Sequence, residues 1–138
     1  MKKIIVLLVA MVSFSALTSC SKDDDGPSLQ GKWEYLKEGV ASGEQEVLED
    51  YSHQSGCAKD YSMITATTIM DHSFNGTACT EEITTTPYTR NGNTITITFG
   101  GETFTAVIKS LTSTTLKVYF TDPDSPTVSE VTVFKRVN

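Results

Sequence analysis

The stretch of sequence that decides the fold is Asn91-Gly92-Asn93-Thr94-Ile95-Thr96-Ile97-Thr98-Phe99-Gly100-Gly101. Its Asn-Gly and Gly-Gly pairs accept the positive φ angles that tight hairpin turns require. Between the two turns apolar side chains alternate with threonines, so Ile95, Ile97 and Phe99 share one face of an extended strand. The stretch therefore predicts a strand at Thr94–Phe99 with one apolar and one polar face, bounded by hairpins.

The same alternation runs through most of the chain after residue 28. It predicts further strands at residues 29–36, 61–72, 77–90, 102–109, 114–121 and 128–137. Residues 39–56 are polar and acidic and are expected to form a long connection, with a short strand or helical turn near residues 46–51. No stretch after Cys20 keeps a 3.6-residue apolar period. The sequence therefore predicts an all-β domain of seven or eight short antiparallel strands, closed into a barrel or folded as a sandwich.

Residues 1–19 are predicted to be a cleaved export signal. The Lys2-Lys3 pair precedes an apolar run from Ile4 to Leu17, which is shorter than the roughly 18 to 20 residues that span a bilayer. The next residues, Leu17-Thr18-Ser19-Cys20, resemble the lipobox of bacterial lipoproteins. That resemblance implies cleavage before Cys20 and attachment of lipid to its thiol. The alternative is an ordinary signal peptide with an incidental cysteine.

Residues 20–28 are expected to form a lipidated tether ahead of a domain at residues 29–138. The run Ser21-Lys22-Asp23-Asp24-Asp25 resembles the acidic signal that follows the lipidated cysteine in surface lipoproteins of Bacteroidetes-type bacteria. The resemblance implies a lipid anchor in the outer membrane and display on the cell surface. The alternative is a solvated acidic tether without export information, which would leave the domain on the periplasmic face.

The mature chain is acidic, which limits its partners. Removal of residues 1–19 takes away Lys2 and Lys3, so 119 residues remain, with 9 basic and 17 acidic side chains. The resulting formal charge of −8 argues against nucleic-acid binding, because phosphate contacts need clustered Lys and Arg. It also argues against a domain that lies flat on an anionic bilayer, so we expect the domain to stand off on its tether.

The chain contains three cysteines, Cys20, Cys57 and Cys79. If Cys20 carries lipid, the other two form an even pair in an oxidising compartment and are predicted to be a disulfide. The bridge would close a loop of about 22 residues and stabilise the fold by roughly 3 kcal/mol. A metal site lacks further ligands, because His53 and His72 are the only histidines, and a catalytic cysteine would need a base beside it.

Several segments together resemble the lipocalin-like domains of Bacteroidetes lipoproteins. They are Gly31-Lys32-Trp33, the Cys57 and Cys79 pair, Asn91–Ile97, Ile108–Leu116 and Phe134–Val137. The likeness extends over residues 29–138 and implies an up-and-down antiparallel barrel of about eight strands. In lipocalins the tryptophan of this motif closes one end of the barrel beneath a basic residue of the last strand. The resemblance therefore implies that Arg136 packs on Trp33, although the alternation in the last strand leaves Lys135 as the other candidate.

The aromatic residues are the best candidates for binding a ligand. The tentative ligand-binding set is Tyr35, Tyr61, Phe99, Phe104 and Phe120. An eight-stranded barrel is just wide enough to be filled by side chains or to hold one small ligand. We therefore expect a non-catalytic protein that binds a small hydrophobic molecule. The alternative is a filled barrel that binds a protein or glycan through its loops.

The sequence shows no catalytic or metal-binding motif and implies no cofactor. His53 and His72 are expected to be solvated surface groups. Glu81 and Glu82 cannot act together, because neighbouring side chains in a strand face opposite sides. The acidic run Glu44–Asp50 is expected to be a solvated loop rather than a calcium site.

Overall fold

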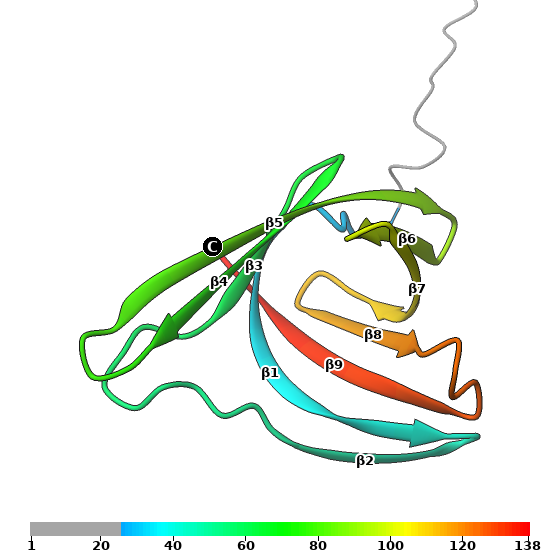
Figure 1. The fold of residues 1–138 in the computed structure, drawn as a ribbon, viewed down its shortest axis with the longest axis horizontal. Coiled ribbons are helices and arrows are strands. Elements are labelled where there is room, and N and C mark those ends of the chain that lie inside the picture. The colour runs from blue at the N-terminus through cyan, green and yellow to red at the C-terminus, as the bar shows by residue number, and fades with distance from the viewer. Residues whose placement is uncertain (1–25) are drawn as a thin grey trace, which may run out of the picture.

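One antiparallel β-sheet wound into a barrel makes up the fold (Figure 1). The computed structural model describes residues 26–138, so the predicted signal peptide, Cys20 and the acidic run after it lie outside the described residues. The strands are β1 (Gly31–Ser42), β2 (Gln45–Asp50), β3 (Tyr61–Ile64), β4 (Thr68–Asn75), β5 (Thr80–Asn91), β6 (Thr94–Phe99), β7 (Glu102–Leu111), β8 (Thr115–Thr121) and β9 (Val128–Val137). The predicted all-β class is confirmed. No helix long and apolar enough to cross a membrane occurs within residues 26–138.

The barrel closes because its first and last strands pair with each other. From β3 to β9 each strand pairs with the next one along the chain, and β9 pairs with β1. The other edge of β1 is shared: residues 31–34 pair with β3, and residues 37–42 pair with β2. Eight strands therefore form the closed up-and-down barrel that the lipocalin resemblance implies, and β2 is an additional strand along β1.

The single strand predicted at residues 61–72 is wrong, because β3 and β4 are two strands joined by a turn. The Thr65 hydroxyl accepts hydrogen bonds from the N–H groups of Thr67 (3.3 Å) and Thr68 (3.0 Å). The Thr65 N–H also donates to the Thr68 carbonyl at 2.9 Å. The threonine side chain stabilises this turn, as glycine or proline does in more recognisable turns. The sequence therefore lacks the residues that usually indicate a turn.

β1 is longer than predicted and contains a bulge. Its register with β9 shifts between Tyr35 and Lys37, and a bulge of this kind changes which side chains face inward. Tyr35 and Val40 consequently both line the interior, although one position is odd and the other even. Beyond the bulge the backbone of β2 approaches very closely: a Cβ atom on Gly39 would lie 1.9 Å from the carbonyl oxygen of Val47.

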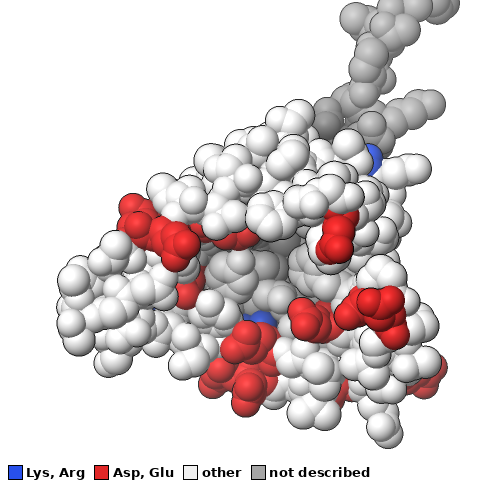
Figure 2. Space-filling model, in the orientation of Figure 1, with Lys and Arg blue, Asp and Glu red and all other residues white. Residues whose placement is uncertain are grey.

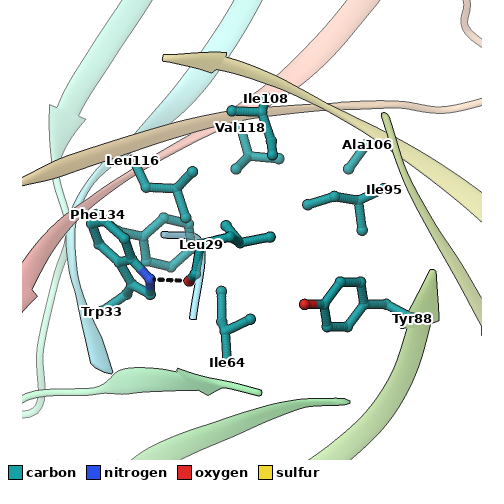
Figure 3. Packing of buried hydrophobic residues seen from close by; sticks show 10 residues of the cluster. All are labelled: Leu29, Trp33, Ile64, Tyr88, Ile95, Ala106, Ile108, Leu116, Val118 and Phe134. Atoms are coloured by element: carbon teal, nitrogen blue, oxygen red, sulfur yellow. Dashed lines mark hydrogen bonds between the residues drawn. The ribbon is translucent and has the colours of Figure 1, made fainter. Parts of the chain in front are cut away.

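The apolar faces predicted from alternation point into the barrel. The main core cluster consists of Leu29, Trp33, Ile64, Tyr88, Ile95, Ala106, Ile108, Leu116, Val118 and Phe134 (Figure 3). Trp33 has no exposed surface. A smaller cluster on the outer face of β1 and β9 consists of Ala41, Val131 and Val133, with Leu48 and Tyr119 packed against it. The barrel wall is therefore apolar on both sides where β1 meets β9.

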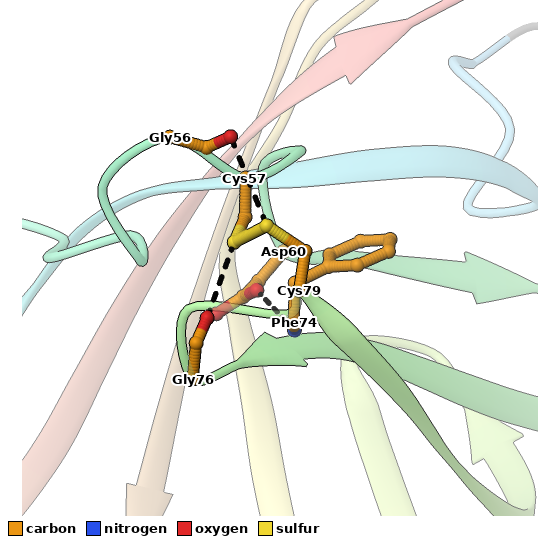
Figure 4. Close-up of a disulfide and its surroundings, with 6 residues drawn as sticks. All are labelled: Gly56, Cys57, Asp60, Phe74, Gly76 and Cys79. Carbon is orange, nitrogen blue, oxygen red and sulfur yellow. Dashed lines mark hydrogen bonds between the residues drawn. A yellow bond between two sulfur atoms is a disulfide. The ribbon is translucent and has the colours of Figure 1, made fainter.

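The predicted disulfide between Cys57 and Cys79 is confirmed, with a Cα–Cα distance of 5.3 Å. It joins the loop between β2 and β3 to the turn between β4 and β5 (Figure 4). The two sulfur atoms also lie 3.5 and 3.7 Å from the carbonyl oxygens of Gly76 and Gly56. The bridge thus fixes two segments that the β-ladders do not pair with each other.

Candidate ligand-binding cavity

One end of the barrel is closed by the segment that precedes β1. The side chain of Leu29 is buried beside Trp33, and the indole Nε1–H of Trp33 donates to the Leu29 carbonyl at 2.8 Å (Figure 3). The guanidinium carbon of Arg136 lies 4.1 Å from the centre of the Trp33 ring. The same guanidinium donates to the carbonyls of Gln30 (2.9 Å) and Ser28. Residues 28–31 are therefore clamped across the end of the barrel.

The structure shows which of the two basic residues at the end of β9 packs on Trp33, a choice that the sequence alternation left open. Arg136 shares the inward face of β9 with Phe134, whereas Lys135 is exposed. The clamp also explains the glycine that precedes Trp33 by two positions. Gly31 has a φ of +134°, and a Cβ atom there would lie 2.5 Å from Nη1 of Arg136. A larger residue at position 31 would push the guanidinium away from the tryptophan.

The other end of the barrel opens into a cavity of about 880 Å³. Figure 2 shows this hollow at the centre of the molecule, seen in the same orientation as the ribbon of Figure 1. Its apolar walls include Ile69, Ile97, Leu116, Val118, Phe120 and Phe134. Small polar side chains, Thr84, Thr86 and Thr132, line other parts of the wall. The interior is thus a lined space that the core side chains do not fill.

Four of the five aromatic residues predicted to bind a ligand line this cavity. Tyr35 and Phe120 lie in its wall, while Phe99 and Phe104 are 61% and 38% exposed at its rim. Tyr61 is a correction, because it does not line the cavity. Its ring stacks on His72 with the ring centres 4.3 Å apart, and the Lys32 ammonium lies 3.9 Å from it. Its neighbours in β3, Ser62 and Ile64, take the inward positions instead.

A hydrogen-bonded group of three side chains interrupts the apolar wall. The Tyr35 hydroxyl donates to Oδ1 of Asp71 at 3.0 Å, and the Ser62 hydroxyl donates to the same oxygen. The Tyr35 ring is also packed between Tyr51 (4.8 Å) and Phe134 (4.7 Å). Burial raises the pKa of the Tyr35 hydroxyl above its ordinary value, and the Asp71 carboxylate raises it further. Tyr35 therefore stays protonated and holds Asp71 in a fixed orientation.

The loop between β2 and β3 fills the space beside the β1 bulge. Oδ1 of Asp60 accepts the Phe74 N–H at 2.9 Å (Figure 4), and its Oδ2 accepts the Tyr51 hydroxyl at 2.9 Å. Burial, together with the hydrogen bond to Asp60, raises the pKa of Tyr51 to about 12. Asp60 is 7% exposed, so this carboxylate acts as a fixed acceptor that ties the loop to β4.

His53 belongs to the same loop and is not the solvated group that we expected. The Asp60 N–H donates to Nδ1 of His53 at 3.0 Å, so that nitrogen carries no proton. The other ring nitrogen, Nε2, must then be the donor in its 2.9 Å hydrogen bond to the Tyr35 carbonyl. His72 lies on the outer face with Nδ1 2.7 Å from Glu81. Neither histidine lines the cavity.

Of the acidic run Glu44–Asp50, all but Glu44 belongs to strand β2, so the run is not a free loop. Glu46 accepts a hydrogen bond from the hydroxyl of Tyr119 and forms an ion pair with Lys117 at 2.9 Å. These two contacts lower the pKa of Glu46, and the contact with Glu46 raises the pKa of Tyr119 to about 12. Within residues 26–138 no group of three or more His, Cys, Asp or Glu side chains could hold a metal ion.

Sequence reasoning missed the polar residues of the cavity. Ser62 and Asp71 could not be placed together, because a single strand was predicted at residues 61–72. The structure has a turn there, which brings both residues to the inward face of neighbouring strands. Glu102 and Glu130 also line the cavity, and here a usable signal existed. In β7, Glu102 shares the inward face with Phe104, because both stand at even positions. In β9, Glu130 shares the inward face with Phe134 for the same reason.

Comparison with known proteins points to one family. The family model described as a lipocalin-like domain matches residues 29–118. No curated protein matches the chain. Among solved structures, a protein from Bacteroides eggerthii has a TM-score of 0.51 at 12% identity, over 80% of this chain and 100% of that one. A bovine odorant binding protein, as a deswapped triple mutant, gives 0.44 at 15% identity, over 78% and 72%. Its complex with undecanal gives 0.45 at 15%, over 78% and 70%.

Proposed function

Because this chain belongs to the family of lipocalin-like domains, we propose that it binds a small, mainly apolar molecule inside its barrel. The observation that carries the proposal is the cavity of about 880 Å³ with apolar walls. Pockets for small ligands typically measure roughly 300 to 1,000 Å³ and combine apolar linings with a few polar groups. The cavity favours this function over the alternative of a filled barrel that binds its partner through loops.

A binding role also fits the places of the groups that could support catalysis. Both nitrogens of His53 are hydrogen-bonded to the backbone of the loop and of β1. His72 pairs with Glu81 on the outer face. The Asp71 carboxylate in the cavity is held by Tyr35 and Ser62, with no histidine, lysine or arginine among the other described lining residues. We therefore propose that the ligand is bound and released unchanged.

The proposed anchor would leave the cavity accessible. Lipid on Cys20 would hold the protein at the outer membrane, on the cell surface or the periplasmic face. The chain enters the barrel at the closed end, where residues 28–31 lie beneath Trp33 and Arg136. The cavity opens at the opposite end of β1, beside Val40. A tether at the closed end would thus turn the opening away from the bilayer.

Ligand binding can be tested by filling the cavity from within. Residues 20–138 with Ser in place of Cys20 should bind the neutral fluorophore N-phenyl-1-naphthylamine with a rise in its emission. In Thr132→Trp, a large ring replaces a small side chain that lines the cavity, and we expect at least tenfold weaker binding. Thr98→Trp adds the same ring on the outer face of β6, where the alternate residues Ile97 and Phe99 face inward, and is the matched control.

The two variants decide between a site inside the barrel and one outside it. Circular dichroism should show that both keep the β fold. Equal affinity of the two variants for the fluorophore would contradict binding inside the barrel. The anchor has a separate test, since Cys20→Ala should move the protein from the membrane fraction to the soluble fraction. Retention of Cys20→Ala in the membrane would refute lipid attachment at that residue.

A further inference from the structure

The charged side chains that line the cavity are all acidic. They are Asp71, Glu102, Asp122, Asp124 and Glu130. The described residues contain fourteen Asp and Glu and eight Lys and Arg, and none of those eight basic residues contributes to the lining. Figure 2 shows acidic side chains on several sides of the hollow. The cavity therefore has largely apolar walls and a negative electrostatic potential.

Most of these carboxylates stand around the opening, beside apolar groups. Glu102 begins β7 and pairs across the turn with Phe99, which is exposed at the rim. Glu130 lies between two lining residues, Val40 of β1 and Phe120 of β8, which are its partners in the sheet. Asp122 and Asp124 lie in the loop between β8 and β9. A ligand that enters the cavity must pass between apolar surfaces and negative charges.

Asp71 offers an acceptor inside the wall. Its Oδ1 takes the hydrogen bonds of Tyr35 and Ser62, which fix the orientation of the carboxylate. Its Oδ2 has no hydrogen-bond donor among the described residues, although Asp71 lines the cavity. No buried side-chain oxygen among the described residues lacks a partner, so this oxygen is open to the cavity. It can accept a donor that arrives with the ligand, and a hydrogen bond to a carboxylate is stronger when the donor is charged.

The arrangement of the carboxylates argues against a metal ion as that partner. Within residues 26–138 no three acidic or histidine side chains converge tightly enough to hold one. None of the five lining carboxylates forms a salt bridge with any described residue. Charges of one sign around a cleft with low-dielectric walls focus their field into it. Such a field attracts a single positive charge and repels a carboxylate.

We propose that the cavity selects cationic amphiphiles, with an alkyl or ring body against the apolar wall and an ammonium or guanidinium group beside the carboxylates. This inference rests on the proposed binding function and adds the ligand class. It differs from a simple hydrophobic preference, because three ligands whose alkyl chains differ by at most one methylene group must then bind in the order amine, alcohol, carboxylate. One methylene accounts for only about 0.8 kcal/mol, which is less than a tenfold difference in affinity.

The test uses decylamine, decanol and decanoate as displacing ligands at pH 7, each below the concentration at which it forms micelles. Displacement of N-phenyl-1-naphthylamine should require at least tenfold less decylamine than decanoate, with decanol between them. The amine-to-carboxylate ratio should shrink when NaCl is raised from 10 mM to 1 M, because the Debye length falls from about 30 to about 3 Å. Equal or tighter binding of decanoate would overturn the ligand class.

Charge-neutralising variants then locate the selectivity. Asp71→Asn keeps an acceptor for Tyr35 and Ser62, and together with Glu130→Gln it should reduce the amine preference at least fivefold. Glu81→Gln removes one charge from the outer face beside His72 and should leave the preference unchanged. An undiminished preference in the double variant would also refute the proposal. If the fluorophore binds inside the barrel but none of the three ligands displaces it, the ligand class is refuted and the binding function stands. The binding function itself fails only if the fluorophore does not bind, or if Thr132→Trp and Thr98→Trp bind it equally.

Discussion

The contacts of Arg136 with Trp33 and with the carbonyls of Ser28 and Gln30 should stabilise the closed end of the barrel, and Arg136→Met tests this. Methionine keeps an apolar stem that can lie against Trp33 but removes the guanidinium. Three contacts are lost: the cation–π contact at 4.1 Å and the hydrogen bonds to the carbonyls of Gln30 and Ser28. The substitution therefore frees the segment that closes the barrel without creating a large cavity.

The expected loss of stability follows from these contacts. A hydrogen bond from a charged donor contributes about 1.5 to 3 kcal/mol, and a cation–π contact about 0.5 to 2 kcal/mol. The three contacts belong to one partly exposed group and do not add fully. We expect the free energy of unfolding to fall by about 2 to 3 kcal/mol. For a domain of this size that corresponds to a melting temperature lowered by about 10 °C.

Urea unfolding followed by tryptophan fluorescence measures the effect, since Trp33 is the only tryptophan and is fully buried. Lys135→Met is the matched control, because Lys135 is the exposed neighbour on the opposite face of β9. It should change the free energy of unfolding by less than about 0.5 kcal/mol, as most surface substitutions do. If the two variants unfold at the same urea concentration, the clamp does not stabilise the barrel as we argue.

Three further outcomes are expected. Replacing both Cys57 and Cys79 with Ser should cost about 3 kcal/mol, because the bridge spans 22 residues and restricts the unfolded chain; urea unfolding that matches the oxidised parent would contradict this. Burial raises the pKa of Tyr51 to about 12, whereas tyrosine in an unfolded chain has a pKa of about 10. The stability that Tyr51 contributes is then complete below pH 10 and lost as pH rises towards 12, so unfolding curves at pH 8 and 11 should differ less in Tyr51→Phe than in the parent. Gly39→Ala should separate β2 from β1, since its Cβ would lie 1.9 Å from the Val47 carbonyl oxygen; unchanged hydrogen-exchange protection of β2 would show that the strands tolerate the methyl group.

The parts of the fold that could be predicted are those in which local pattern and tertiary structure agree. β6, β7, β8 and β9 follow the predicted strands to within two residues at each end, because alternation and turn dipeptides both mark them. The strands from β1 to β4 are harder to predict from the sequence. The turn at Thr65 uses side-chain hydroxyls, and the bulge after Tyr35 reverses the alternation within one strand. Neither feature has a distinct signature in a single sequence.

The cavity could be predicted only in part for the same reason. Phe99, Phe104 and Phe120 were found because they lie on the clearly alternating strands. Tyr61 was misplaced because the true inward residue of β3, Ser62, is small and polar. Alternation identifies the inward face by its apolar residues, so it fails where that face carries a serine and a carboxylate. The positions most informative about the ligand are therefore the ones that a hydrophobic pattern conceals.

The side chains that line the cavity differ in size from one side of the barrel to the other, and this difference explains why the interior stays open. Large apolar side chains project from β6, β8 and β9, but the inward positions of β5 that line the cavity are Thr84 and Thr86. Tyr35 could reach across the space, yet it is held against the wall by Asp71 and by stacking on Tyr51 and Phe134. Threonine is too small to meet the opposite wall, and a tethered ring cannot swing into the gap. The cavity is thus maintained by polar groups on one side, and these groups are the ones available to recognise the charged end of a ligand.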